Sequence, residues 1–271
     1  MRADFHVHSN CSLDSSEPMA NSIEAAIRLG LSAICFTDHL DLIRADTPGK
    51  RFGAESLANW ERSYAEIAKN RARFGNQIEI LHGMELGEGV QDPTFAKTAT
   101  SLPGLDFVLG SIHALTGVQD FYLLDYPDYD TCFSLAESYV DETIRLASYG
   151  FFDVLAHIGI VNRYMVRAGQ RIDFLLFEEK LRHLFKLLIE SGRGIELNTS
   201  GLRQGTGVTF PDLPVLALYQ DCGGEIVTIG SDAHRATDVG RNFDHACALL
   251  KSAGFAYQTI FRERKPVFIP L

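Results

Sequence analysis

Histidines and carboxylates recur along the chain at spacings that could bind metal ions. His6 and His8 lie two residues apart near the N-terminus, and Asp232 and His234 repeat this spacing near the C-terminus. Side chains two residues apart on a β-strand point to the same face, so each pair could bind one ion. Six of the nine histidines and three acids lie at or near the ends of short apolar runs: His6, His8, Asp38, His39, Glu85, His113, His157, Asp232 and His234.

Imidazole and carboxylate groups in one cluster favour transition-metal ions such as zinc, iron, manganese or nickel. The five cysteines are scattered and never form a CxxC pair, which argues against a structural zinc site. The nine residues above are too many for one ion, so we expect a cluster of two or three ions with a carboxylate such as Glu85 as the bridge. Ions held about 3.5–4 Å apart can share a hydroxide and stabilise a phosphoryl group in transfer.

A simpler explanation must be weighed for each histidine. A single histidine at the end of a strand is more often a hydrogen-bonded core or loop residue than a metal ligand. Six such positions would need the same coincidence repeatedly, so we favour metal binding for them. The simpler explanation holds for the other three. His82 lies three residues before Glu85 and should face the opposite side of its strand, and His183 and His245 lie inside helical segments.

Seven apolar runs occur along the chain, and six of them carry these residues. Each run is short and rich in Ile, Val, Leu and Phe, as in strands covered on both faces. The runs span 3–8, 31–39, 78–86, 107–113, 152–159, 194–201 and 225–234. Helical spacing of apolar residues occurs between them, at 22–30, 56–74, 131–149, 174–191, 211–221 and 239–253. This alternation predicts one α/β domain over residues 1–271 with a parallel sheet, either open or closed.

The carboxyl ends of parallel strands meet at one face, which is where active sites form in such sheets and barrels. We therefore expect the candidate ligands to lie together. Residues 114–130 are aromatic and acidic and predict a loop that could cover the site. Substrate choice should depend on this loop and on residues 40–55, and Asp120 or Asp125 could face a cationic substrate.

Composition excludes several classes of partner. The net charge is -10, from 35 acids and 25 bases, which disfavours a nucleic acid polymer and is compatible with a cationic substrate. No stretch of 18 consecutive apolar residues occurs and the N-terminus lacks the apolar core of a signal peptide, so we expect a cytoplasmic protein without a membrane partner. The sequence carries no indication of the oligomeric state.

Two arginines follow the same strand ends. Arg163 comes six residues after His157, and Arg203 follows the sixth apolar run. A guanidinium group beside a metal cluster could bind a phosphate group through two hydrogen bonds. A lone arginine in a loop is more often a solvated surface residue, and position alone does not decide between the two.

Taken together, these residues resemble the polymerase and histidinol phosphatase (PHP) family. The family pattern of HxH, an acid, DH, E, H, H and DxH is matched by HVH (6–8), Asp14, TDH (37–39), GMELG (83–87), GSIH (110–113), AH (156–157) and GSDAH (230–234). The resemblance covers nearly the whole chain. It implies a distorted seven-stranded (β/α)7 barrel with the active site at the C-terminal ends of the strands.

The resemblance also implies a site for three divalent metal ions, of zinc, iron or manganese. Carried over residue by residue, the first ion takes His6, His8, Glu85 and Asp232. The second takes Glu85, His113 and His157, and the third takes Asp14, His39 and His234.

Within the family, ELNTSGLR (196–203) and HIGIVNRY (157–164) are similar to the arginine segments of the histidinol-phosphatase branch, which implies that Arg163 and Arg203 bind phosphate. The expected reaction is hydrolysis of L-histidinol phosphate to L-histidinol and phosphate, a step of histidine biosynthesis, by attack of a metal-bridging hydroxide. The leaving alkoxide needs either a proton or a metal ion, and the sequence does not choose between Asp232, His234 and a metal-bound water as the source of the proton. The alternatives are a phosphoesterase acting on a nucleotide such as AMP or a nucleoside 3',5'-bisphosphate, and a non-catalytic metal-binding protein.

Overall fold

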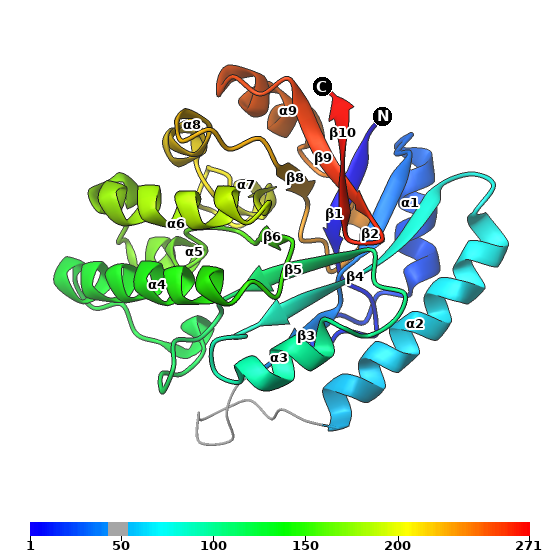
Figure 1. The fold of residues 1–271 in the computed structure, drawn as a ribbon, viewed down its shortest axis with the longest axis horizontal. Helices are drawn as coiled ribbons and strands as arrows, with labels where there is room; N and C mark the ends of the chain where they lie inside the picture. Colours follow the sequence, from blue (N-terminus) through cyan, green and yellow to red (C-terminus); the bar gives the residue numbers. More distant parts are fainter. Residues whose placement is uncertain (43–53) are drawn as a thin grey trace.

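The computed structural model describes residues 1–42 and 54–271, and its centre is a parallel β-sheet (Figure 1). The strands follow the order β1-β2-β4-β5-β6-β7-β8, and every neighbouring pair is parallel. Their bounds are Ala3–Val7 (β1), Ala33–Phe36 (β2), Glu79–Gly87 (β4), Phe107–Ser111 (β5), Val154–Leu155 (β6), Gly194–Asn198 (β7) and Val227–Gly230 (β8). A short further strand, β3 (His39–Asp41), also pairs with β4.

The sheet curls into a nearly closed barrel. Its last gap lies between β1 and the residues after β8, where Val7 and Ala233 form a parallel bridge. Across this gap His8 N donates to Ala233 O, and Asp232 N donates to His6 O, both at 2.8 Å. The predicted barrel of seven parallel strands is therefore confirmed, and each predicted apolar run contains one of its strands.

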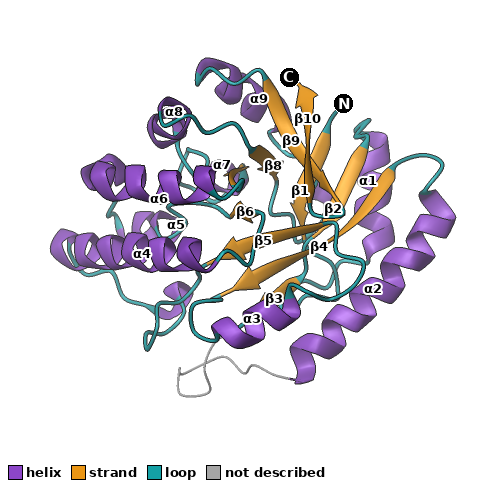
Figure 2. Ribbon diagram, in the orientation of Figure 1, coloured by secondary structure: helices purple, strands orange, loops and turns teal. Residues whose placement is uncertain are grey.

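Helices surround the strands (Figure 2). Their bounds are Met19–Arg28 (α1), Ala54–Phe74 (α2), Pro93–Ala99 (α3), Tyr129–Tyr149 (α4), Asn162–Met165 (α5), Glu178–Glu190 (α6), Ser200–Arg203 (α7), Leu213–Asp221 (α8) and Phe243–Ser252 (α9). Four short 3-10 turns, η1–η4, span Phe121–Leu123, Val166–Ala168, Phe174–Phe177 and Ala236–Asp238. Over residues 1–42 and 54–271, the structure contains no helix that could cross a membrane.

Three helices begin later than predicted, and each has a local cause. The Asp212 side chain accepts a hydrogen bond from Val215 N and caps α8, which starts at Leu213 instead of residue 211. Residues 174–177 form the 3-10 turn η3, in which Leu175 N donates to the Asp173 side chain at 2.9 Å, so α6 starts at Glu178. Asn242 has a φ of 62°, in the left-handed region, so α9 starts only after it. None of these changes moves a predicted site residue.

β1 contains an irregularity that turns its histidines into the barrel. Asp4 pairs with Ile34 and Val7 pairs with Phe36, so β1 has one residue more than β2 between these pairs. Phe5 belongs to the core cluster inside the barrel, the inner core cluster, which includes Phe107 and Phe261. Val7 instead belongs to a cluster outside the barrel, which includes Ile23 of α1. The register shift, a β-bulge, therefore reverses which residues face inward and lets His6 follow Phe5 into the interior.

A C-terminal hairpin closes the other end of the barrel. β9 (Tyr257–Arg262) and β10 (Lys265–Pro270) are antiparallel and are coloured orange-red and red in Figure 1. Ile260 and Phe261 of β9 belong to the inner core cluster, and the Phe261 ring lies 5.1 Å from that of Phe107. No element was predicted from the sequence in this region. The hairpin buries Ile260 and Phe261, whereas Tyr257 and Phe268 stay exposed.

Candidate metal centre

The predicted ligands lie together at the carboxyl ends of the strands. They are His6 in β1, His8 just after it, Asp14 before α1, His39 in β3, Glu85 in β4, His113 after β5, His157 after β6, and Asp232 and His234 after β8. Their ligand atoms form overlapping groups in which all atoms lie within 4.8 Å of one another. Nine residues from seven separate segments of the chain thus converge as the parallel sheet predicts.

The first group consists of His6, His8, Glu85 and Asp232. The Nε2 atoms of His6 and His8 lie 3.0 Å apart, and Glu85 Oε2 lies 3.0 Å from the first and 3.3 Å from the second. Asp232 Oδ1 lies 3.8 Å and 3.5 Å from the same two nitrogens. All four residues are buried. Two nitrogens and two oxygens therefore point toward one small volume.

The second group shares Glu85 with the first. Its Oε1 atom lies 2.9 Å from His157 Nε2 and 3.2 Å from His113 Nε2, and these two nitrogens are 3.3 Å apart. Glu85 thus uses one oxygen for each group. A carboxylate in this position can bridge two ions.

The third group consists of Asp14, His39 and His234, and it lies nearest to solvent. A nitrogen of His8 also lies within 4.8 Å of its ligand atoms, so His8 borders both the first and the third group. Asp14 Oδ2 lies 2.7 Å from His234 Nε2 and 3.5 Å from His39 Nε2. The other ring nitrogen of His39, Nδ1, lies 3.1 Å from Asp41 Oδ1. Asp41 therefore orients the His39 ring, as carboxylates commonly orient metal-binding imidazoles.

The charges of the cluster suit bound cations. Burial alone would raise the pKa of Glu85, but the neighbouring histidines, first among them His39 and His6, hold that pKa well below its ordinary value. The pKa of Asp232 is also held well below its ordinary value, chiefly by His6, against the effect of burial. Burial lowers the pKa of His8 to about 3, and neighbouring histidines add to this shift. Ionised carboxylates and a neutral imidazole are the forms that bind metal.

The donor set fits divalent metal ions. Imidazole nitrogens face each other at 3.0 Å and 3.3 Å, and at each contact a carboxylate oxygen lies within 3.3 Å of both nitrogens. Lone pairs that converge in this way repel one another unless a proton or a cation lies between them. A divalent metal ion can accept all of them at once.

The third group opens into a cavity of about 320 Å³. Ligands from all three groups line it, together with Arg163, Tyr164 and two residues of the 114–130 segment, Asp120 and Tyr122. The prediction that this segment could cover the site agrees with that placement. In the other predicted loop, 40–55, residues 43–53 lie outside the described residues.

The two predicted arginines have different surroundings. Arg163 lines the cavity, and its Nη2 atom donates to Asp232 Oδ2 at 2.8 Å and to Ser200 Oγ at 2.7 Å. Arg203 donates from Nη1 and Nη2 to the backbone carbonyls of Ser231 and Asp232, both at 2.5 Å. Among the described residues that line the cavity, Arg203 does not occur. It holds the segment that carries Asp232, and its contact with phosphate stays a prediction.

The remaining histidines lie where the sequence analysis placed them. His82 packs with its ring 5.7 Å from that of Trp60 and 5.6 Å from that of Tyr64, both on α2, on the side of β4 away from Glu85. His183 and His245 are exposed on α6 and α9. None of these three lies in a metal-binding group that the described residues form.

Two buried carboxylates near the ligands are notable. Asp38, at the end of a predicted run, accepts hydrogen bonds from Ser9 and Ser63. Glu196, which the sequence analysis did not single out, lies 2.7 Å from His6 Nδ1 through Oε1. A glutamate in the middle of the apolar run of β7 was the available signal, because an acid buried inside a strand needs a partner.

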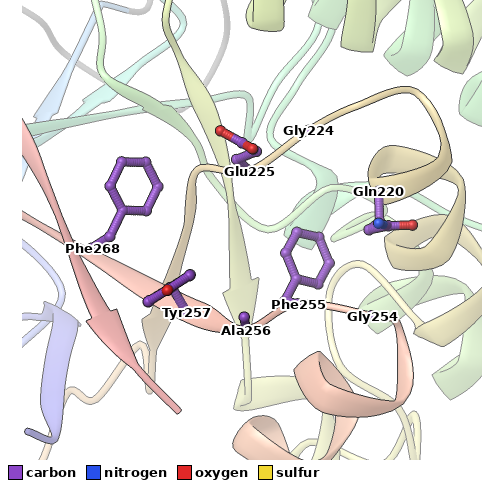
Figure 3. A pocket seen from close by; sticks show the side chains of 8 residues that line it. All are labelled: Gln220, Gly224, Glu225, Gly254, Phe255, Ala256, Tyr257 and Phe268. Atoms are coloured by element: carbon purple, nitrogen blue, oxygen red, sulfur yellow. The ribbon is translucent and has the colours of Figure 1, made fainter.

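A second hollow lies at the opposite end of the barrel (Figure 3). Its volume is about 520 Å³, and the rings of Phe255, Tyr257 and Phe268 line it. Glu225 is the carboxylate among its lining residues, which include no histidine, so this part of the described chain offers no comparable metal site.

The fold and the site together define a parallel α/β barrel with a metal-binding end. The sequence profile described as the PHP domain matches residues 4–200. The chain therefore belongs to the PHP domain family, as the motifs predict.

Similar proteins extend over the full chain. A probable histidinol-phosphatase from Clostridium acetobutylicum is 28% identical and covers 97% of each chain. A histidinol-phosphatase from Lactococcus lactis is 27% identical, over 97% of this chain and 96% of its own. The crystal structure of the L. lactis histidinol phosphate phosphatase with zinc, L-histidinol and phosphate superimposes with a TM-score of 0.82 at 26% identity and covers 98% of each chain.

Proposed function

We propose that this protein is a phosphomonoesterase that hydrolyses L-histidinol phosphate to L-histidinol and phosphate. The observation that carries the proposal is a buried arginine that lines the same cavity as the metal-binding groups. The guanidinium group of Arg163 lines the cavity and is held there by Asp232 Oδ2 and Ser200 Oγ. It can therefore donate to a phosphate oxygen at the edge of the cluster. Similarity to a phosphatase whose structure holds zinc, L-histidinol and phosphate supports the substrate.

Three divalent ions would be held by the three groups described above. His6, His8, Glu85 and Asp232 would bind the first, Glu85, His113 and His157 the second, and Asp14, His39 and His234 the third. Bound ions supply Lewis acidity and lower the pKa of a water molecule so that it can attack phosphorus. Zinc in the L. lactis structure favours zinc, and the same donors also suit iron and manganese.

Residues of the chain position the substrate and the proton. Arg163 presents its fixed fork of donors to the phosphate group. The leaving alkoxide must take up a proton, and Asp232 and His234 both line the cavity. Because Asp232 is ionised, it could only relay a proton from a water molecule, so the candidate donors are His234 and a water molecule. A cavity of about 320 Å³ is suited to a small phosphorylated molecule rather than a nucleic acid polymer.

Steady-state kinetics on zinc-loaded protein tests the proposal, with L-histidinol phosphate, AMP and a nucleoside 3',5'-bisphosphate compared side by side. We expect kcat/KM for L-histidinol phosphate to exceed that for either nucleotide. The Glu85→Gln variant, purified in the same way, controls for contaminating phosphatases. Efficient turnover of a nucleotide with little activity on L-histidinol phosphate would instead identify another phosphoesterase.

Metal analysis of the same preparation separates an enzyme from a non-catalytic metal-binding protein. We expect more than one divalent ion per chain after gentle purification. Fewer than one ion per chain, together with no turnover of any of the three substrates, would contradict the proposed function.

A further inference from the structure

Glu196 is a fully buried carboxylate on β7 that faces the barrel interior next to the metal-binding groups. A buried charge is costly unless several partners compensate it. Both of its oxygens have such partners. Oε1 lies 2.7 Å from His6 Nδ1, and Oε2 accepts hydrogen bonds from His157 N at 2.9 Å and Asn198 Nδ2 at 3.1 Å. Glu196 therefore contacts two of the strand-end histidines without itself lying in a metal-binding group.

The contact with His6 decides which ring nitrogen is free. Because Glu196 lies at Nδ1, that nitrogen carries the proton of the neutral ring, and Nε2 keeps its lone pair toward Glu85. The hydrogen bond to His157 N fixes the backbone from which the second group's imidazole projects.

A chain of hydrogen bonds continues from Glu196 to the arginine in the cavity. Asn198 Oδ1 accepts from Ser200 N at 2.9 Å and from Ser200 Oγ at 2.5 Å. Ser200 Oγ in turn accepts from Arg163 Nη2, and the same Nη2 donates to Asp232 Oδ2. Asn198 and Ser200 are fully buried. The chain thus begins at one residue of the first metal-binding group, His6, and ends at another, Asp232.

A glycine on the neighbouring strand leaves the space that the Glu196 carboxylate occupies. Gly230 of β8 pairs with Asn198 of β7. A Cβ atom at position 230 would lie 2.1 Å from Glu196 Oε1 and 2.5 Å from His6 Cβ. Neither atom belongs to a flexible surface side chain, so any residue other than glycine would displace the pair.

We propose that Glu196 is a positioning residue that holds His6 for metal binding and, through Asn198 and Ser200, holds Arg163 at the cavity. The proposal rests on the proposed function for its second half, the placement of a phosphate-binding arginine. Its first half concerns metal affinity alone. Breaking the chain at different points should therefore separate the two effects.

Zinc affinity is the first readout, measured by competition with a chromophoric chelator and no substrate present. We expect Glu196→Gln to bind zinc about 10–100-fold more weakly than the wild type, because an amide cannot accept from both His6 and its other donors. Glu142→Gln is the matched control, since Glu142 is also buried and accepts hydrogen bonds from Thr116, and within residues 1–42 and 54–271 it makes no hydrogen bond to a histidine. It should lower Tm without changing zinc affinity.

Ser200→Ala breaks the chain beside Arg163 and leaves the Glu196–His6 contact in place. We expect unchanged zinc affinity, unchanged kcat, and a KM for phosphomonoesters that rises severalfold. If Glu196→Gln fails to fold, Asn198→Ala replaces it, because it removes one hydrogen bond from Glu196 Oε2 and should weaken zinc binding by a smaller factor.

Wild-type zinc affinity in Glu196→Gln, or an equal loss in Glu142→Gln, would overturn the proposal. Ser200→Ala with an unchanged KM would overturn its second half. These outcomes are distinct from a failure of the proposed function, which would appear as poor turnover of L-histidinol phosphate by the wild-type protein. The zinc affinities are measured without substrate, so they would still test the contact between Glu196 and His6.

Discussion

The two ends of the barrel use the same strands for different purposes. At the carboxyl ends, Glu85 and Asp14 face histidines. At the amino ends, Glu79 pairs with Arg262, and Asp153 pairs with Arg264. An imidazolium can release its proton to solvent so that the ring nitrogen binds a metal ion. Guanidinium groups keep their protons and neutralise the carboxylates permanently.

This difference separates chemistry from stability within one sheet. The open end, at the carboxyl ends of the strands, gathers ionised carboxylates and imidazoles around a cavity. Burying these charges together is costly in free energy unless cations neutralise them. At the closed end, which is formed by the amino ends of the strands, the β9–β10 hairpin covers the barrel, and Phe107, Ile260 and Phe261 are buried in the inner core cluster. Substitutions at the open end should therefore change activity, and those at the closed end should change the free energy of unfolding.

The largest expected effect is at Glu85, the carboxylate shared by two metal-binding groups. Glu85→Gln should lower kcat/KM by about 10²–10³-fold on the phosphomonoester that the wild type turns over fastest, because an amide bridges cations poorly. Glu79→Gln is the matched control on the same strand, at its closed end. It should keep wild-type kcat/KM. Equal losses in the two variants would contradict the division between the ends.

The second expected effect is a loss of stability without a loss of activity, at the closed end. Arg264 donates to Asp153 Oδ2 at 2.5 Å and to the backbone carbonyls of Thr100 and Phe151. Arg264→Ala should lower the free energy of unfolding by about 3 kcal/mol, because it leaves the largely buried Asp153 without its charged partner. Denaturant unfolding measures the loss, with exposed Arg145→Ala as control. A large fall in kcat/KM of the folded variant would show that the two ends are not independent.

Much of the open end could be predicted from the sequence, because the place of each ligand depends only on its position along its own strand. Each strand is a short apolar run, and a polar residue at its carboxyl end must lie at one face of a parallel sheet. His113 and His157 follow that rule directly. The motif order of the family then groups the same residues by ion. The prediction succeeded where a residue's position along its own strand determined its surroundings.

Other features depend on contacts that no local pattern contains. The bulge that turns His6 inward is visible only in the register of β1 against β2. The partner of Glu196 comes from β1, far away in sequence, across the space left by Gly230. The hairpin that carries Arg264 turns through Glu263 and Arg264 themselves, at φ values of 49° and 63°, without the glycine that usually marks such a turn.

A third effect concerns His82, which shares β4 with Glu85 but has the opposite kind of surroundings. Burial, and then Arg71, lower the pKa of His82 to about 4, while Asp106 opposes the shift. The native state therefore resists protonation that the unfolded chain accepts below about pH 6.5. The stability associated with neutral His82 is fully present above this pH and is lost as the pH falls toward 4.

Replacing His82 tests this pH dependence. The stability of His82→Phe relative to wild type should increase by about 2 kcal/mol between pH 6.5 and pH 5, since each pH unit contributes about 1.4 kcal/mol. Denaturant unfolding of both proteins at several pH values measures the difference. His183→Phe, at an exposed position on α6, serves as the control and should show no such trend. A pH-independent difference for His82→Phe would contradict the role assigned to its burial.

The smallest expected effect is at the rim of the open end, where Asp120 lines the cavity and Asp125 is exposed outside the lining. Asp120→Asn should raise KM for the cationic L-histidinol phosphate about fivefold, since a solvent-exposed charge pair contributes about 1 kcal/mol. Asparagine can still accept the hydrogen bond from Tyr122 N that caps η1, so the loop should keep its conformation. Kinetics with phenyl phosphate, which carries no cation, should be unchanged, and Asp125→Asn should match wild type on both substrates. An equal rise in KM for both substrates would mean that Asp120 shapes the loop rather than attracts the cation.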